Sequence, residues 1–219
     1  INNSCEEKNM QLSKVTSWGL ILGGLLGILG FMAFALALGL MDEDIAPADE
    51  LKAFQDNQLF VGVMVLLFVG IFTYMAKSLL QVGQAVKVPD EWFMYMRMLV
   101  IVMLATLFVS MSTWMVISEK TTVESFEMVG LVGESVDVIQ VVAGSFVFFI
   151  LTVFALKNGA GNVIFRVLIA ILGVLAVLDI LGLLISDLDL DDSIGFITWI
   201  LWSLCLVGIG VLGLTTKEA

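Results

Sequence analysis

Six apolar runs, each about as long as a bilayer is thick, constrain this chain more than any other feature. A spanning helix needs about 20 predominantly apolar residues. The sequence predicts such spans at Trp18–Met41, Leu59–Leu80, Met98–Ile117, Val138–Leu156, Val163–Ile185 and Ile194–Leu214. Only 14% of the residues are charged, against about a quarter in a soluble domain. We therefore predict an all-α fold, a polytopic membrane protein with a bundle of six transmembrane helices and short loops.

The polar segments between these runs leave no room for a second domain. The two longest are Asp42–Gln58 and Ser118–Asp137, and both are shorter than chains that usually fold alone, about 40 residues or more. We predict that residues 1–219 form a single transmembrane domain. Because Ser118–Asp137 mixes acids with apolar side chains, we also expect a short helix there, lying at the membrane interface.

The distribution of Lys and Arg predicts how the spans are oriented, because short loops rich in these residues stay in the cytoplasm. If both termini share one side of the membrane, the opposite side carries only Lys52 and Lys120. The side of the termini then carries eight basic residues: Lys8, Lys14, Lys77, Lys87, Arg97, Lys157, Arg166 and Lys217. We predict a multi-pass protein of the plasma membrane with both termini in the cytoplasm.

The opposite side of the membrane is predicted to be acidic. The acids of this chain, whose net charge is −11, gather in the segments 42–56, 119–137 and 187–192. Such an exterior can attract cations, meet a basic partner or suit saline surroundings. It leaves no basic surface for nucleic acid. Trp114, Trp199 and Trp202 are expected near the same interface, as part of an aromatic belt.

The residues that most enzymes use are missing. Histidine is absent, and Cys5 and Cys205 are isolated from each other, which removes the usual general base and the usual metal and haem ligands. We find no HExxH, GxGD or Walker A motif, each of which would indicate a specific chemistry. We therefore predict a protein that is not an enzyme and has no cofactor.

Small residues form a stripe along the first span. Gly19, Gly23, Gly27 and Gly30 fall within an arc of about 80° at roughly 100° per residue. Such a stripe lets two helix backbones approach closely in lipid. Two interpretations stay open: an interface with another subunit or a second copy, and packing against another helix of this chain.

Asp179 is the one acid set well inside a predicted span. It lies about 9 Å from the outer end of the fifth run at 1.5 Å per residue, and no Lys or Arg is predicted at that depth. Gln140, Ser145 or Thr106 are candidates to hydrogen-bond it. One interpretation is a proton or cation site, and the other is a protonated or solvated acid near the interface.

The fourth span carries a line of polar residues. Glu134, Ser145 and Thr152 nearly eclipse in helical projection, and Asp137 lies about 60° away. Such a line can flank a water-filled path, although Ser and Thr in membrane helices often bond their own backbone. We take Asp179, Glu134, Asp137 and Gln140 as the candidate ion or proton site.

A short acidic segment partly resembles a calcium loop. Asp187, Asp189 and Asp191 occupy the first three acidic positions, but Asp192 stands where the loop needs Gly and Thr198 where it needs Glu. This excludes an EF-hand. A weak metal site and a solvated acidic rim stay open as alternatives.

Two functions from different classes follow from these features. The first is a non-catalytic integral membrane subunit that packs with itself or with other membrane subunits. The second is a channel or transporter for protons, sodium or divalent cations with an acidic outer mouth. In both cases the expected partners are the lipid bilayer and either other subunits or cations at the outer face.

Overall fold

The computed structural model of the protein describes residues 12–41, 45–184 and 192–215. The helices in order are α1 (Lys14–Leu25), a π-helical turn η1 (Leu26–Gly30), α2 (Phe31–Leu38), α3 (Pro47–Asp56), α4 (Gln58–Ala85), α5 (Asp90–Met115), α6 (Val123–Lys157), α7 (Val163–Leu184) and α8 (Asp192–Thr215). Six segments of this described chain are long and apolar enough to span a bilayer. The predicted all-α bundle of six membrane helices is therefore confirmed.

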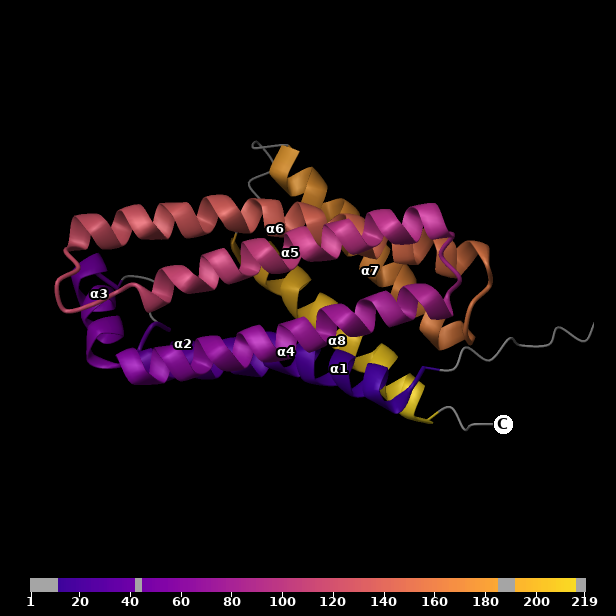
Figure 1. Ribbon diagram of the computed structural model, residues 1–219, viewed down its shortest axis with the longest axis horizontal. Helices are drawn as coiled ribbons and strands as arrows, with labels where there is room; N and C mark the ends of the chain where they lie inside the picture. The colour runs from indigo at the N-terminus through magenta and orange to yellow at the C-terminus, as the bar shows by residue number, and fades with distance from the viewer. Residues whose placement is uncertain (1–11, 42–44, 185–191, 216–219) are drawn as a thin grey trace, which may run out of the picture.

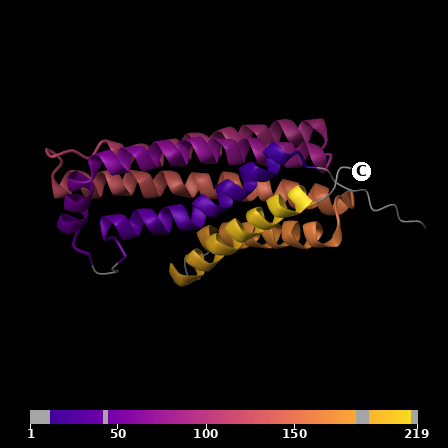
Figure 2. The ribbon, with the colours of Figure 1, turned by 90° about the horizontal axis from the view of Figure 1, so that it is seen from below.

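The six spanning segments form a closed ring. Each packs against the next in the chain, in the order α1, α4, α5, α6, α7 and α8, and α8 returns to pack against α1. Figures 1 and 2 show α4, α5 and α6 running side by side along the long axis, with α8 inclined to them. A ring of six helices encloses a central space that side chains must fill.

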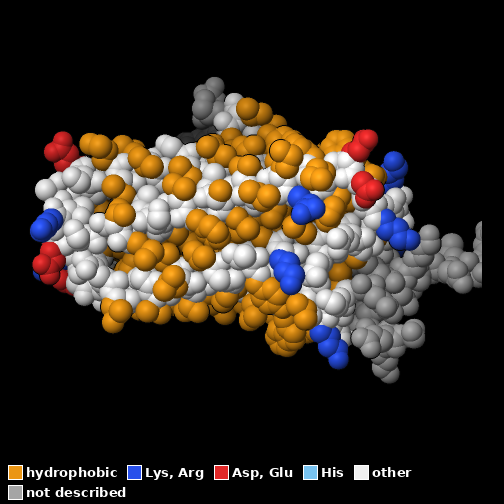
Figure 3. Space-filling model, viewed as in Figure 1, with side chains coloured by type: hydrophobic (Ala, Val, Ile, Leu, Met, Phe, Trp, Pro, Cys, Tyr) orange, Lys and Arg blue, Asp and Glu red, His pale blue; other side chains and the backbone are white. Residues whose placement is uncertain are grey.

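The two ends of the bundle differ in charge, and the flanks between them are apolar. The basic end carries Lys14, Lys77, Lys87, Arg97, Lys157 and Arg166, beside Asp90 and Glu91. The acidic end carries Asp49, Glu50, Asp56, Glu119, Glu124 and Glu127, beside Lys52 and Lys120. Figure 3 shows hydrophobic side chains covering the flank between these ends. Leu66 and Ile101 are about two-thirds exposed there, as lipid-facing side chains of an integral membrane protein are.

The fourth membrane helix is much longer than predicted. It begins at Val123 rather than at 138 and runs for 35 residues, about 52 Å at 1.5 Å per residue. The Thr122 hydroxyl caps its start by accepting a hydrogen bond from the Ser125 backbone N–H at 3.3 Å, which satisfies a free helical donor. The prediction of a separate interfacial helix within Ser118–Asp137 is therefore wrong, because its residues belong to α6.

The first long polar segment also contains a helix. In α3, Pro47 stands in the first turn, where its missing N–H costs nothing, followed by Asp49 and Glu50. Leu51 and Phe54 are buried against the bundle. The helix thus covers the acidic end beside the start of α6 (Figure 1).

Helices α1 and α8 interlock through a reciprocal pattern that has the same spacing in both. The pattern is Ser17 and Gly24 in α1 with Gly27 in η1, and Ser203, Gly210 and Gly213 in α8. A Cβ added at Gly24 would lie 2.6 Å from the Ser203 carbonyl oxygen, and one added at Gly210 would lie 2.6 Å from that of Ser17. Because each backbone touches the other, the pair is locally two-fold symmetric.

Candidate functional site

A cavity of about 370 Å³ occupies the centre of the ring, and all six spanning segments contribute to its wall. Among its fifteen described lining residues, four have oxygen-bearing side chains: Gln140, Ser145, Asp179 and Thr198. The other lining residues are apolar or aromatic. Asp179 is the one titratable group in this described lining.

Asp179 projects from α7 toward α6. The Ser145 hydroxyl donates a long hydrogen bond of 3.5 Å to the Asp179 Oδ2, so Ser145 is the partner among the three candidates. The Thr106 hydroxyl instead donates to carbonyls of its own helix, at Val102 and Met103. No Lys or Arg belongs to the described cavity wall, so this carboxylate has no basic counterion there.

Gln140 reaches the same cavity from α6, one and a half turns from Ser145. Its Oε1 is buried and has no hydrogen-bond partner among the described residues. A buried acceptor left without a donor costs about 1–3 kcal/mol. The structure therefore brings two of the predicted site residues, Asp179 and Gln140, to one cavity, where each presents an acceptor with room for a further donor.

Glu134 and Asp137, the other two predicted site residues, do not line this cavity. Both side chains are exposed on α6. The reason is the length of α7, which ends at Leu184, only five residues beyond Asp179. On the antiparallel α6 that end is level with Gln140, so Glu134 and Asp137 lie beyond the cover of α7.

Thr152, the third member of the predicted polar line, ties two helices together. Its hydroxyl donates to the Ile169 carbonyl of α7 at 2.8 Å. A Cβ added at Gly173 would lie 2.6 Å from the Thr152 Cγ2. This residue therefore sits in a close contact between α6 and α7, on the same face that carries Ser145.

Three tryptophans expected in an interfacial belt are half-buried and make ring contacts within the bundle. Trp114 stacks on Phe34, with ring centroids 5.0 Å apart. Trp199 and Trp202 line the cavity. The physical reason is the wide centre of a six-helix ring, which needs large side chains to approach the packing density of a protein interior.

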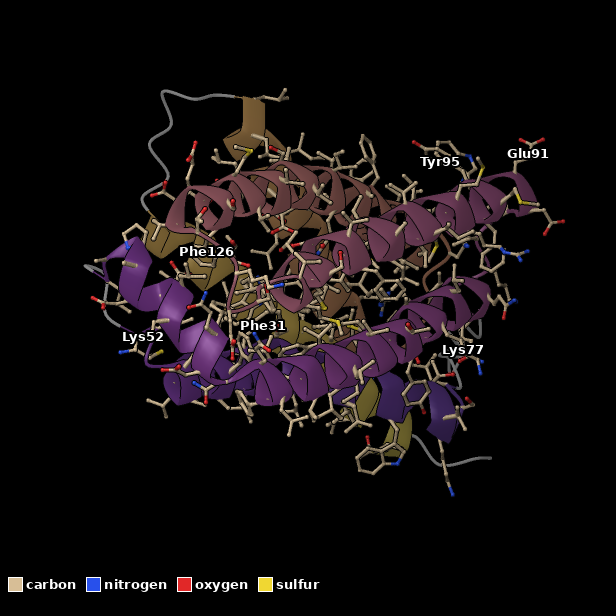
Figure 4. All side chains as sticks on the ribbon, turned by 60° about the vertical axis from the view of Figure 1, so that its left-hand side comes forward. Phe31, Lys52, Lys77, Glu91, Tyr95 and Phe126 are labelled. Atoms are coloured by element: carbon tan, nitrogen blue, oxygen red, sulfur yellow. The ribbon has the colours of Figure 1, made fainter. Side chains whose placement is uncertain are left out.

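Aromatic rings also fill the bundle between the cavity and the acidic end. Phe31 lies inside the bundle, with Lys52 and Lys77 toward opposite ends (Figure 4). Ring contacts run from Phe31 through Trp114 and Phe34 to Phe54 on α3, and from Phe54 to Phe126 on α6. These side chains, the aromatic plug, lie between the cavity and the acidic end.

The glycine stripe of the first span faces two helices of the same chain. Positions Gly19, Gly23 and Gly30 lie against α4, where added Cβ atoms would meet Ser78, Met75 and Phe68. Gly27 lies against Ser203 of α8. The closest backbone contact falls at Gly24, one residue outside the stripe, because two partner helices divide this surface between them.

The acidic segment with Asp187, Asp189 and Asp191 lies outside the described residues. In the ranges that are described, no group of three or more Cys, Asp or Glu side chains could hold a metal ion.

The aromatic part of the cavity wall was missed from the sequence. Phe31, Phe72, Phe148, Trp199 and Trp202 line it, but each belongs to a long apolar run in which any face can meet lipid or protein. The single available signal was the spacing of Trp199 and Trp202, which puts both on one helix face.

Comparison with known proteins finds no matching family model, no similar curated protein and no similar solved structure.

Proposed function

We propose that this integral membrane protein binds a monovalent cation in the central cavity and carries it across the bilayer, with Asp179 as the binding carboxylate. The position of Asp179 carries the proposal: it is half-buried in the wall of a cavity lined by six apolar helices, without a basic neighbour in the described wall. A charged side chain at such a site costs about 2.5–3.5 kcal/mol on insertion scales. A proton or a bound cation offsets this cost.

The number of ligands favours a monovalent over a divalent cation. Calcium takes six to eight oxygen ligands, whereas four side chains of the described wall carry oxygen and one of these is an acid. The aromatic plug separates the cavity from the acidic end. These features favour a transporter that opens to each side in turn over a continuously open pore.

Cation flux into proteoliposomes tests this function. We expect the parent protein to carry protons or sodium, and Asp179→Asn to lower the flux by about tenfold or more, equivalent to about 1.4 kcal/mol. The matched control is Asp137→Asn, since Asp137 is a carboxylate on a membrane helix that does not line the cavity. It should leave the flux within about twofold, as expected for a surface change.

Two results would contradict the proposal. The first is a parent protein that carries no ion under any gradient. The second is a flux that Asp179→Asn and Asp137→Asn change equally. Asp179→Asn should melt at the parent's temperature or slightly above it, because an amide need not be held uncharged in an apolar site; the flux comparison is therefore between folded proteins.

A second candidate is a non-catalytic subunit of a membrane complex, with itself or other membrane proteins as partners. It is favoured by the part of α6 that extends beyond the end of α7, where Met128, Leu131 and Val132 are more than half exposed. An apolar stripe outside the bilayer suits an interface. The test is the mass of the purified protein in mild detergent: Leu131→Glu should release a partner if this stripe is its contact.

A further inference from the structure

Aromatic rings make up a third of the described cavity wall, which a binding site for a small inorganic cation does not require. Phe31, Phe72, Phe148, Trp199 and Trp202 are five of its fifteen described residues. They form edge-to-face pairs across the ring of helices: Phe31 with Trp199 at 6.0 Å between centroids, and Phe148 with Trp202 at 5.3 Å. Both the faces and the edges of large rings therefore border the space.

Such a wall fits an organic cation better than a small inorganic one. Metal ions in proteins are held by several oxygen ligands that replace their hydration shell, and this wall offers few. A cation with an apolar body instead gains from ring faces through cation–π attraction and from burial of its body among apolar side chains. The cavity volume, about 370 Å³, lies within the range of small-molecule sites, about 300–1,000 Å³.

The hydrogen-bonding groups of the wall indicate which kind of organic cation fits. The Gln140 Oε1 is buried and has no partner in the described part of the chain. Asp179 accepts one long bond from Ser145, and a carboxylate has room for further donors. Gln140 and Asp179 therefore favour a ligand that donates hydrogen bonds from a positively charged group, which a protonated amine does and a metal ion does not.

We propose that the cavity binds a protonated organic amine with an apolar or aromatic body. The ammonium group donates to Asp179 and to the Gln140 Oε1, while Trp199 and Phe31 on one side and Trp202 and Phe148 on the other enclose the body. This inference rests on the proposed cation-binding function and names the substrate class of that same site.

Calorimetric binding to the purified protein in phosphatidylcholine nanodiscs tests this assignment. The probe is 2-phenylethylammonium, and its neutral counterpart is propylbenzene, which replaces the ammonium by a methyl group. We expect saturable binding of the ammonium probe and binding weaker by about tenfold or more in Asp179→Asn, since a hydrogen bond to a charged group contributes about 1.5–3 kcal/mol. Propylbenzene binding should be equal in parent and variant, which also shows that the variant keeps its cavity.

A second variant tests the role of Gln140. Gln140→Leu should weaken binding of 2-phenylethylammonium by about tenfold or more, because a hydrogen bond that involves a charged group contributes about 1.5–3 kcal/mol. It should change binding of the N,N,N-trimethyl analogue less than about twofold, because that probe has no N–H to donate. Asp137→Asn, outside the cavity, should bind both probes as the parent does.

The inference is overturned if the parent shows no saturable binding of the ammonium probe, if Asp179→Asn binds it as tightly as the parent, or if sodium at millimolar concentration displaces it. Failure of the two proposals can be told apart. Asp179-dependent flux of protons or sodium without amine binding would retain the cation transporter and remove the amine. Amine binding without any flux would retain the site and remove transport.

Discussion

Asp179 and Asp137 are the same chemical group on neighbouring membrane helices, yet their surroundings differ. Asp179 is half-buried in the cavity wall and accepts one long hydrogen bond from Ser145. Asp137 lies on an exposed stretch of α6, outside the cavity wall. Desolvation penalises the charged form of a carboxylate most where water is excluded. Burial, rather than residue type, therefore singles out Asp179 as the candidate site.

A second residue-scale feature is the contact between Gly173 and Thr152, which leads to a stability prediction. Gly173→Ala should destabilise the protein by about 1–3 kcal/mol, the usual cost of overpacking, because its Cβ would lie 2.6 Å from the Thr152 Cγ2 and 2.9 Å from the Thr152 Cβ. The β-branched Thr152 has little rotamer freedom to move away. Thermal unfolding in detergent measures the effect.

The double variant supplies the control for this contact. Thr152→Ala removes the two closest atoms, so Gly173→Ala should cost less in that background, with a coupling energy of about 0.5–3 kcal/mol. Additive effects of the two substitutions would contradict the close packing of α6 on α7.

At the scale of helices, the interlock of α1 with α8 predicts two sensitive glycines. Gly24→Ala and Gly210→Ala should each lower stability by about 1–3 kcal/mol, because each Cβ would meet a backbone oxygen of the partner helix, which cannot rotate away. The matched control is Gly70→Ala in α4, where no atom lies within 4 Å of the added Cβ. It should be neutral or stabilising by up to about 1 kcal/mol through helix propensity. If all three variants melted at the same temperature, the close backbone contact between α1 and α8 would be contradicted.

The length of α6 predicts that its first turns stand outside the hydrocarbon layer. At 1.5 Å per residue α6 exceeds α7 by about 20 Å, and a bilayer core is about 30 Å thick. We replace Met128 or Phe149 by Cys, in a background without Cys5 and Cys205, and attach an environment-sensitive fluorophore. Both positions are well exposed. We expect water-like emission at 128 and lipid-like emission at 149, and lipid-like emission at both would show that the bilayer covers all of α6.

For the whole molecule, the charge difference between the two ends predicts its orientation. The described part of the basic end carries six Lys and Arg residues, Lys87 in a connection and the others toward the ends of the helices, and an excess of basic residues is typical of the cytoplasmic side. In the same cysteine-free background, Lys87→Cys should react with a membrane-impermeant maleimide only after cells are permeabilised. Asp49→Cys at the acidic end should react in intact cells, and the reverse pattern would invert the proposed topology.

Much of the architecture could be predicted from the sequence, because a bilayer imposes a one-dimensional requirement. Each crossing must be helical and apolar over about 20 residues, and that pattern is legible along the chain without any tertiary contact. The second predicted run starts within a few residues of the start of α4, and the third ends within a few residues of the end of α5. The fifth run agrees with α7 at both ends. The start of α6 was misplaced because its exposed acids mimic a loop, whereas the Thr122 cap shows where the helix begins.

What only the tertiary structure decided is which faces of these helices meet. Within a membrane, lipid and protein interior are equally apolar, so hydropathy cannot tell a lipid-facing Phe from one in the cavity wall. The closed ring places Asp179 beside Ser145, 34 residues away in the chain, and gathers Phe31, Trp199 and Trp202 around one space. The sequence by itself determined that the chain spans a membrane six times with an acid inside one span. The close packing of the ring decided that this acid faces an aromatic cavity, because side-chain volume and backbone contact, rather than hydrophobicity, select helix partners in lipid.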